Sequence, residues 1–419
     1  MSFTRNQLVI IGAGVVVVAA LAAVFVFGFG QQTQVPEVAL TMAGTLDEAL
    51  ARNLIDGYRG IRPNVDITYT YFREEEYERR ILDLLASGQA PDIVMIEDGW
   101  LSRYKNKIVP AAAAQFPLAS VRQFFPQAVE QAFVADGFVY ALPAAIDTLA
   151  LFYNKDLFDA KTIAFPPRSW DDFGKIIPAL REVDIGGRIT RPAAAIGGSG
   201  KSIPHASDIL SLLFLQSGEP KIEGGVARFD DPGVAALGYY VSFANPLAET
   251  YTWNDNLPNP FDNFANGTVA MIFGYAKDIP GLKSKNAFLN FGVAPAPQRN
   301  SSRPVSLPRF SGFAVAAQSR LPQWGWDFIV QATTNPALVE PVSASLGQSP
   351  ALRTLVEKYS NDPDRGVFAR QALTARLWPA PDADAARQIF SDAIAAVLSG
   401  RLSSNQALAQ AAEKINSMR

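Results

Sequence analysis

Cysteine is absent from the 419 residues of this chain, and histidine occurs once, as His205. Without thiols the chain can form no disulfide, no thiolate metal site and no cysteine nucleophile, and a single imidazole cannot build a histidine-rich metal centre. Any catalysis must then use carboxylates, hydroxyls, Lys or Tyr. We assign no catalytic residue, no metal site and no cofactor. The lack of cysteine does not locate the protein, because a chain with a large core needs no disulfide in an oxidising compartment.

Positive charge is not in excess either, since 37 Lys and Arg stand against 40 Asp and Glu. This balance gives no broad positive field to attract phosphate backbones, which argues against nucleic acid as a partner. Hydrophobic residues make up 48% of the chain and charged residues 18%, a composition typical of ordered globular proteins. The length exceeds one ordinary core and indicates two or three domains.

One long uncharged run stands near the N-terminus, from Leu8 to Gly30, and Arg5 precedes it. At about 1.5 Å per residue this run is long enough to cross a bilayer as a helix. A cleaved signal peptide has a shorter apolar region followed by small residues, so the pattern favours an uncleaved anchor, with cleavage as the alternative. Arg5 on the short side favours a globular part outside the cytoplasm.

The next part of the chain alternates between strand and helix patterns. Val35 to Met42 indicates a strand, and Thr45 with Glu48 three residues later is a capping-box signature that predicts the start of a helix. A strand, a helix and a strand are then expected over Val65 to Tyr71, Glu74 to Ser87 and Ile93 to Ile96. Strands separated by helices in this way form a parallel sheet, and ligands bind beyond the carboxyl ends of such strands. This places Gly44, Asp98 and Trp100 in candidate cleft loops.

A second alternation of apolar runs and helical patterns begins at Leu149 and predicts a second α/β lobe. The late segments Phe291 to Ala294 and Phe313 to Ala316 indicate further strands. Two closing helices are expected over Ala385 to Leu398 and Asn405 to Ile415.

Ala195 to Ser202 matches a relaxed phosphate-loop pattern. A phosphate loop requires a helix that starts at once, so that backbone N–H groups surround the phosphates. Pro204 makes a continuous helix from Lys201 doubtful, so we do not assign nucleotide binding. His205 beside this loop is expected to be a surface or capping residue.

Several short motifs occur in a fixed order along the chain. They are Ala86-Ser87-Gly88-Gln89-Ala90-Pro91-Asp92-Ile93-Val94, Tyr140-Ala141-Leu142-Pro143, Leu151-Phe152-Tyr153-Asn154-Lys155-Asp156-Leu157-Phe158, Pro166-Pro167-Arg168-Ser169-Trp170-Asp171-Asp172-Phe173, Phe264-Ala265-Asn266-Gly267-Thr268-Val269-Ala270-Met271 and Phe291-Gly292-Val293-Ala294-Pro295. With this order and spacing the sequence resembles the extracellular solute-binding proteins of the maltose-binding type, which serve ABC importers.

The resemblance implies an α/β, two-lobed periplasmic-binding-protein-like fold behind an N-terminal transmembrane helix. Chain passages between the lobes are expected near Pro143 to Leu149, Phe291 to Pro297 and Leu346 to Pro350. The expected division is 1–34 for anchor and linker, 35–145 for the first lobe, 146–292 for the second, 293–347 for the return to the first lobe, and 348–419 for C-terminal helices mostly on the second. Many relatives are lipoproteins attached through a cysteine, which this chain lacks.

Eight residues are candidate ligand contacts, each with a structural alternative. Trp253 lies in a polar, turn-rich segment and could cover the C–H face of a sugar ring or pack in a satellite core. Asp147 could contact a ligand or cap a helix or turn, and Arg309 could reach the cleft or form a salt bridge. The full set is Gly44, Asp98, Trp100, Asp147, Trp253, Tyr275, Arg309 and Trp378.

These features predict a monomeric, non-enzymatic receptor at the cell membrane, with its globular part extracellular or periplasmic. It would capture a small polar solute, a sugar or oligosaccharide, between its lobes and pass it to an ABC transporter permease. One alternative is a surface glycosidase, which needs two carboxylates about 5 to 10 Å apart. Another is a binding lobe that acts as a sensor or adhesin.

Overall fold

The computed structural model describes residues 36–418, except 224–225, 364 and 379–381. The expected anchor from Leu8 to Gly30 therefore lies outside the described residues. Within the described ranges, no helix is both long and apolar enough to cross a membrane.

The first sheet has five strands in the order β2-β1-β3-β16-β4. Strand β1 (Val38–Gly44) pairs in parallel with β2 (Val65–Tyr71) and with β3 (Ile93–Glu97), which confirms the parallel sheet predicted from the sequence. Strand β16 (Ser311–Ala316) comes from much later in the chain and lies antiparallel between β3 and β4 (Ile108–Val109). The first lobe is therefore completed by a distant segment.

Helix α2 (Glu48–Ile61) follows β1, and α3 (Glu74–Ala86) connects β2 to β3 as expected. The predicted capping box was wrong, because the N-cap of α2 is Asp47, whose carboxylate accepts the N–H of Ala49. Asp47, and not Thr45, takes the N-cap position because it directly precedes the helix, where its side-chain oxygen reaches a free backbone N–H. The remaining elements of this half are α4 (Leu101–Tyr104), α5 (Leu118–Phe124), α6 (Gln127–Phe133), β5 (Val134–Ala135), β6 (Phe138–Val139), α13 (Pro322–Thr334), α14 (Pro336–Ser345), α15 (Arg353–Tyr359) and α16 (Gly366–Ala372).

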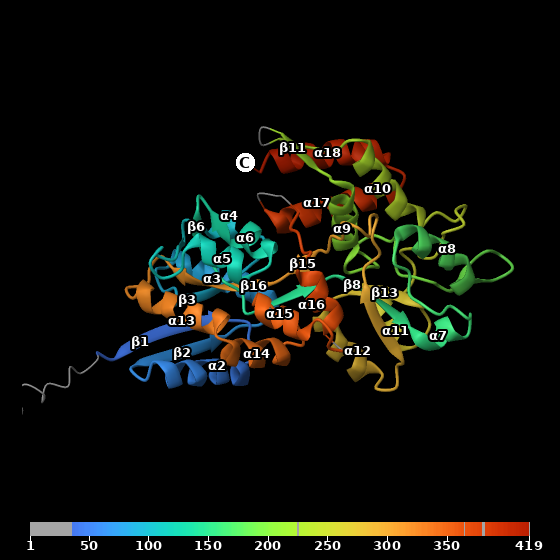
Figure 1. Ribbon diagram of the computed structural model, residues 1–419. Helices are drawn as coiled ribbons and strands as arrows, with labels where there is room; N and C mark the ends of the chain where they lie inside the picture. Colours follow the sequence, from blue (N-terminus) through green and yellow to red (C-terminus); the bar gives the residue numbers. More distant parts are fainter. Residues whose placement is uncertain (1–35, 224–225, 364, 379–381, 419) are drawn as a thin grey trace, which may run out of the picture.

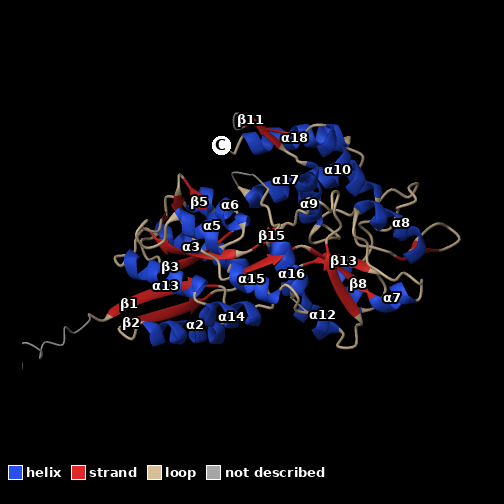
Figure 2. Cartoon of the chain, in the orientation of Figure 1, coloured by secondary structure: helices blue, strands red, loops and turns tan. Residues whose placement is uncertain are grey.

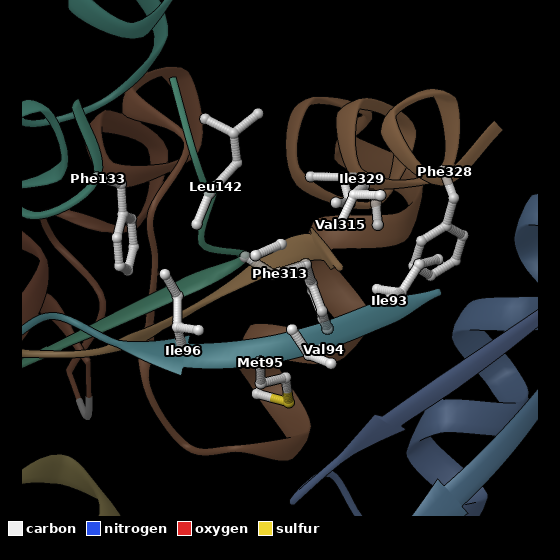
Figure 3. Packing of buried hydrophobic residues seen from close by; sticks show 14 of the residues in the cluster. Ile93, Val94, Met95, Ile96, Phe133, Leu142, Phe313, Val315, Phe328 and Ile329 are labelled. Carbon is white, nitrogen blue, oxygen red and sulfur yellow. The ribbon is translucent and has the colours of Figure 1, made fainter. Parts of the chain in front are cut away.

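The first core lies around this sheet, where Phe313 and Val315 of β16 pack near Phe328 and Ile329 of α13 (Figure 3). The rings of Phe313 and Phe328 meet edge to face with centroids 6.1 Å apart. Gly325 lets α13 approach the sheet closely, because a Cβ there would lie 2.9 Å from a methyl of Val315. This packing fixes β3, whose end carries two candidate site residues.

The second sheet is antiparallel, in the order β13-β8-β14. It consists of β8 (Ala150–Asn154), β13 (Met271–Gly274) and β14 (Phe291–Pro295). Around it lie α7 (Lys155–Asp159), α8 (Trp170–Leu180), β9 (Glu182–Val183), β10 (Ile189–Arg191), α9 (Ala206–Ser217), β11 (Lys221–Glu223), β12 (Val226–Arg228), α10 (Asp231–Ser242), α11 (Pro260–Ala265), the 3-10 helix η1 (Ala276–Asp278), α12 (Ile279–Lys285), α17 (Ala383–Leu398) and α18 (Ser404–Asn416). Figure 1 shows these elements on the opposite side of the molecule from β1 and β2.

A third sheet, β15-β7-β17, lies between the two halves (Figure 2). Strand β7 (Ala145–Thr148) pairs with β15 (Pro308–Arg309) and with β17 (Ser349–Pro350). Buried residues belong to the first core up to Ile146 and to the second from Leu149, and they return to the first core after Leu307. We call this three-stranded sheet the hinge.

A chain passage between the lobes was expected near Phe291 to Pro297, but β14 belongs to the second sheet. The chain returns to the first half later, at β15. After the hinge, Leu352 and Leu355 form a small separate cluster with Val339, and Phe368 belongs to the second core. The other buried hydrophobic residues stay with the first core until the change between Ala375 and Trp378. The buried amide of Gln371 ties this region to the hinge: it donates to Thr148 and to the carbonyl of Leu149 and accepts from the N–H of Ala296.

Candidate functional site

Two cavities lie where the hinge meets both cores, with volumes of about 640 Å³ and 290 Å³. The larger is within the range of roughly 300–1,000 Å³ found for small-molecule sites. Asp208 and Arg309 line both cavities, so the two are adjacent. Together they form what we call the cleft.

Side chains from the first core, the second core and the hinge line the larger cavity. They include Tyr71, Glu97, Phe310 and Phe313 from the first, His205, Asp208, Tyr275 and Lys277 from the second, and Asp147 and Arg309 from the hinge. Aromatic rings can cover apolar faces of a solute while the charged groups meet its hydroxyls. The cavity is therefore suited to a polar molecule with some apolar surface.

A buried polar network centres on Asp208 of α9. Arg309 donates to its carboxylate at 3.0 Å, Tyr275 donates at 3.2 Å, and Nδ1 of His205 lies 3.5 Å away. Burial acts to raise the pKa of Asp208, but Arg309 and His205 outweigh it and hold the pKa well below its usual range. Asp208 is therefore ionised at neutral pH.

His205 lies between two carboxylates, with its ring nitrogens 3.5 Å from Asp208 and 3.4 Å from Asp278. Burial acts to lower its pKa, but the two carboxylates overcome this and raise the pKa to about 9. Sequence reasoning took His205 as a surface or capping residue, and this was wrong: it is the N-cap residue of α9 by position, but its side chain makes no capping bond and lines the larger cavity.

Asp147 lines the larger cavity with only 1% of its surface exposed. Its carboxylate accepts the N–H groups of Thr148 at 2.8 Å, Ala276 at 2.9 Å and Lys277 at 3.0 Å. Burial raises its pKa to about 6, although these bonds act in the opposite direction. Asp147 thus caps the first residues of η1 from the hinge, the structural alternative considered for it, while standing at the cavity wall.

The smaller cavity is lined by Asp98, Trp378 and Arg387, among others. Neither carboxylate oxygen of Asp98 has a hydrogen-bond partner in the described part of the chain, and the same holds for the indole N–H of Trp378. Burial raises the pKa of Asp98, although Arg309 and Arg387 act to lower it. The Trp378 ring stacks on Phe229 with centroids 6.3 Å apart. Unsatisfied buried polar groups of this kind call for an additional partner.

Five of the eight candidate contacts line the cleft: Asp98, Asp147, Tyr275, Arg309 and Trp378. Gly44 ends β1 just before the cavity wall, and a Cβ there would lie 2.5 Å from the sulfur of Met95. Trp100 stacks on Tyr104 at 5.3 Å and donates from its indole nitrogen to Asp384 at 2.7 Å. Neither Gly44 nor Trp100 lines the two cavities.

Trp253 has no exposed surface and belongs to the second core. Its indole N–H donates to the hydroxyl of Ser202 at 3.2 Å, and it does not line either cavity. The polar segment around it had suggested a ligand platform, but this geometry favours the packing alternative. In this structure Trp253 offers no ring face to a ligand.

The loop from Ala195 to Ser202 is not followed at once by a helix, since α9 begins at Ala206. The Asp255 carboxylate accepts the N–H of Ser199 at 2.7 Å and the hydroxyls of Ser199 and Ser202 at 2.6 and 2.7 Å. An anion of the protein itself thus occupies the donors that a phosphate would need.

Sequence reasoning placed Glu97 in a candidate cleft loop, but it missed Asp208 and Arg387 as cleft residues, along with the buried setting of His205. A weak local signal existed, because Asp208 follows His205 by three residues and helical spacing brings such pairs together. The partner Arg309 is 101 residues away and gave no local signal.

Contacts also join the two halves across the rims of the cleft. Arg103 of α4 lies 3.3 Å from Asp382 and 3.0 Å from Asp384 at the start of α17. On another side, Lys277 of η1 lies 3.3 Å from Glu74 of α3. Both pairs link a helix of the first half to an element of the second.

No metal centre is evident in the residues that the structure describes, where no group of three or more His, Asp or Glu side chains is arranged to hold an ion.

Comparison with known proteins adds a family and a fold. A family model described as bacterial extracellular solute-binding protein matches residues 56–367. A maltotriose-binding protein of Pyrococcus abyssi is 22% identical over 343 residues, which cover 78% of this chain and 69% of the relative. A putative binding protein of Brucella abortus is 20% identical over 85% of this chain and 86% of its own length.

Two solved structures illustrate the likeness in fold. The sugar-binding protein MalE of Xanthomonas citri has a TM-score of 0.76 and 18% identity, over 91% of this chain and 97% of its own. The GacH receptor of Streptomyces glaucescens, solved unliganded and with acarbose, has a TM-score of 0.72 and 20% identity, over 91% and 98%. The two-lobed α/β fold predicted from the sequence is thereby confirmed.

Proposed function

This chain belongs to the family of bacterial extracellular solute-binding proteins, and from that membership we propose that it captures a sugar or oligosaccharide in the cleft between its lobes. The captured solute is then presented to the permease of an ABC importer. The observation that carries the proposal is the cavity of about 640 Å³ whose wall combines both cores and the hinge. A ligand there contacts both lobes at once.

Such a site converts binding into a change of shape. A ligand stabilises the closed arrangement only by contacts that it makes there and not in an open one. Glu97 lies on the first lobe, Arg309 and Asp147 lie on the hinge, and Asp208 and Tyr275 lie on the second lobe. One polar solute can therefore bond to groups on both sides of the cleft.

The relatives support a carbohydrate as the solute. Similar proteins include a maltotriose-binding protein, and similar structures were solved with maltotetraose and with mannotriose. The cleft of this chain offers the matching chemistry, with aromatic residues such as Tyr71, Phe310 and Trp378 beside carboxylates and a guanidinium. Capture without chemical conversion is part of the proposal.

Further parts of the proposal concern the whole chain. Leu8 to Gly30 would anchor the protein as a single membrane-spanning helix, with a monomeric globular part outside the cytoplasm. The lobes would be divided as predicted from the sequence up to residue 292, but the return to the first lobe would come at β15 and the last change to the second lobe between Ala375 and Trp378.

A thermal-shift screen over mono- and oligosaccharides tests the central claim, because a ligand that binds only the folded protein raises its melting temperature. We expect at least one sugar to raise it in a concentration-dependent way and to be recovered unchanged after long incubation. A screen in which amino acids or peptides stabilise the protein and sugars do not would contradict the proposal.

A further inference from the structure

Two consecutive carboxylates at the end of β3 face different cavities. Glu97 lines the larger cavity and Asp98 lines the smaller one. Neighbouring residues of an extended chain point to opposite sides, which explains the arrangement. Both halves of the cleft therefore receive an acid from the same strand end.

Neither carboxylate has a partner among the described residues. Both oxygens of Asp98 are buried and without a hydrogen bond, and the side chain of Glu97 forms no ion pair or hydrogen bond there. Asp98 is only 5% exposed. Burial and the adjacent Asp98 raise the pKa of Glu97, although Arg309 and Arg387 act to lower it.

The cations of the cleft, in contrast, are already matched by carboxylates. Arg309 pairs with Asp208, and His205 lies between Asp208 and Asp278. The other pairs are Lys277 with Glu74, Arg73 with Glu76 and Arg387 with Asp384. After this pairing, Glu97 and Asp98 are the acids at the end of β3 to which no cation of the described residues is bonded.

We propose that this cleft selects among sugars by charge and prefers one that carries a protonated amine, which the free carboxylates of Glu97 and Asp98 accept. The inference rests on the proposed function and narrows its substrate class to amino sugars or sugars with a basic ring nitrogen.

The physical reason is the difference between two kinds of hydrogen bond. An ammonium N–H to a carboxylate is charge-assisted and about twice as strong as a neutral hydrogen bond. A neutral hydroxyl can also donate to Asp98, but it leaves the buried negative charge uncompensated. A uronic acid would bring a third negative charge against Glu97 and Asp98, since the arginines beside them already have partners.

Calorimetric titration with matched sugars tests the inference. The probes are pairs in which an amine replaces a hydroxyl. Glucose and glucosamine, and galactose and galactosamine, differ in one such group, cellobiose and the β-1,4 disaccharide of glucosamine differ in two, and glucuronic acid is the anion. For the pair that binds most tightly, we expect the amine to bind at least tenfold more tightly than the hydroxyl form. Glucuronic acid should bind at least tenfold more weakly than glucose.

Variants then assign the preference to these acids. Asp98→Asn and Glu97→Gln keep the shape and remove the charge, and at least one of them should bring the ratio of amine to hydroxyl affinity close to one. A melting curve of each variant shows whether it is folded. If one of the two variants does not fold, the other still tests the inference. Asp66→Asn is the matched control, because it removes a carboxylate from the exposed part of β2 and should keep the wild-type ratio.

The outcomes separate the two proposals. Neutral sugars that bind as tightly as their amines, or an unchanged ratio in both folded variants, overturn this inference and leave the proposed function standing. Binding of no sugar of any charge overturns the proposed function and the inference with it.

Discussion

The guanidinium of Arg309 lies 3.0 Å from the carboxylate of Asp208, and this ion pair connects hinge strand β15 to helix α9 of the second lobe. Asp208 is buried, with a side chain that is 5% exposed, and Arg309 is 28% exposed. Both residues line both cavities. The pair therefore marks the boundary at which the two parts of the cleft meet.

Removal of Arg309 should destabilise the protein. In Arg309→Ala the carboxylate of Asp208 stays buried and loses its strongest cationic partner, which typically costs about 3 kcal/mol of unfolding free energy. Denaturant unfolding measures this loss. Arg59→Ala removes exposed ion pairs with Asp56 and Asp66 and should cost less than about 1 kcal/mol. Equal effects of the two substitutions would contradict the role given to Arg309.

Trp253→Ala should lower the unfolding free energy by about 3–5 kcal/mol, because the ring is fully buried and its loss leaves a cavity. Ligand affinity, measured under conditions where the variant stays folded, should change little. Phe288→Ala is the control, since Phe288 is 95% exposed. A variant that keeps its stability but no longer binds the sugar would contradict the packing role and show that Trp253 contacts the ligand.

From the raised pKa of His205 we predict that the folded protein loses stability as the pH rises above neutrality. Its pKa is about 9 in the folded protein, above the ordinary 6.5, so the folded state holds a proton that the unfolded state releases. The stabilisation is complete below about pH 6.5 and disappears as the pH passes 9, with a slope of up to about 1.4 kcal/mol per pH unit. Denaturant melts at pH 6 to 9.5 should show this slope, and His205→Gln should remove it. A slope that persists in the variant would assign it to another group.

From the contacts of Arg103 with α17 we predict that its removal speeds the release of a bound ligand. It is about one-third exposed and contacts Asp382 and Asp384 across the cleft, a setting in which an ion pair contributes roughly 0.2–1 kcal/mol. Arg103→Ala should therefore speed dissociation of the bound sugar by up to about fivefold. Arg122→Ala, which breaks a pair with Glu130 within the first lobe, should leave the rate unchanged when both are measured by stopped flow.

The anchor proposal predicts that the full chain sediments with membranes, while a chain that starts at Gln34 stays in solution as a monomer. Only the run from Leu8 to Gly30 supplies a lipid-compatible surface of this length. Fractionation and N-terminal sequencing of the native protein measure this. A mature N-terminus near Gln31 would show cleavage instead.

Local patterns predicted the regular elements well because their cause is local. The apolar spacing of Tyr77, Ile81, Leu84 and Leu85 predicted α3. Three of these side chains are buried, and Leu84 is partly buried against the first core. Strand β3 was expected from four consecutive apolar residues and is found at Ile93–Glu97. Such periodicity predicts structure because residues at helical or strand spacing lie on one face of the element, and that face packs against the core.

The site was harder to predict because its partners are distant in sequence. Asp147 was identified as an acid at a chain passage, but its backbone partners lie about 130 residues later, in η1. Trp253 was misplaced because an irregular segment has no period that shows which side faces the core. The charge state of Asp208 depends on Arg309, a pairing that no local pattern could show.

Strand β16 has a consequence for the order of events during synthesis. It lies between β3 and β4, yet the ribosome makes both of those strands long before it reaches Ser311. Until then the nascent first sheet lacks its central antiparallel strand, and β3 presents an unpaired edge of the kind that invites wrong pairing. The second lobe cannot be completed earlier either, because its core includes residues of α17 and α18 from the end of the chain. Neither lobe can close before most of the polypeptide has emerged, so a nascent chain of this topology depends on protection from aggregation until translation is nearly complete.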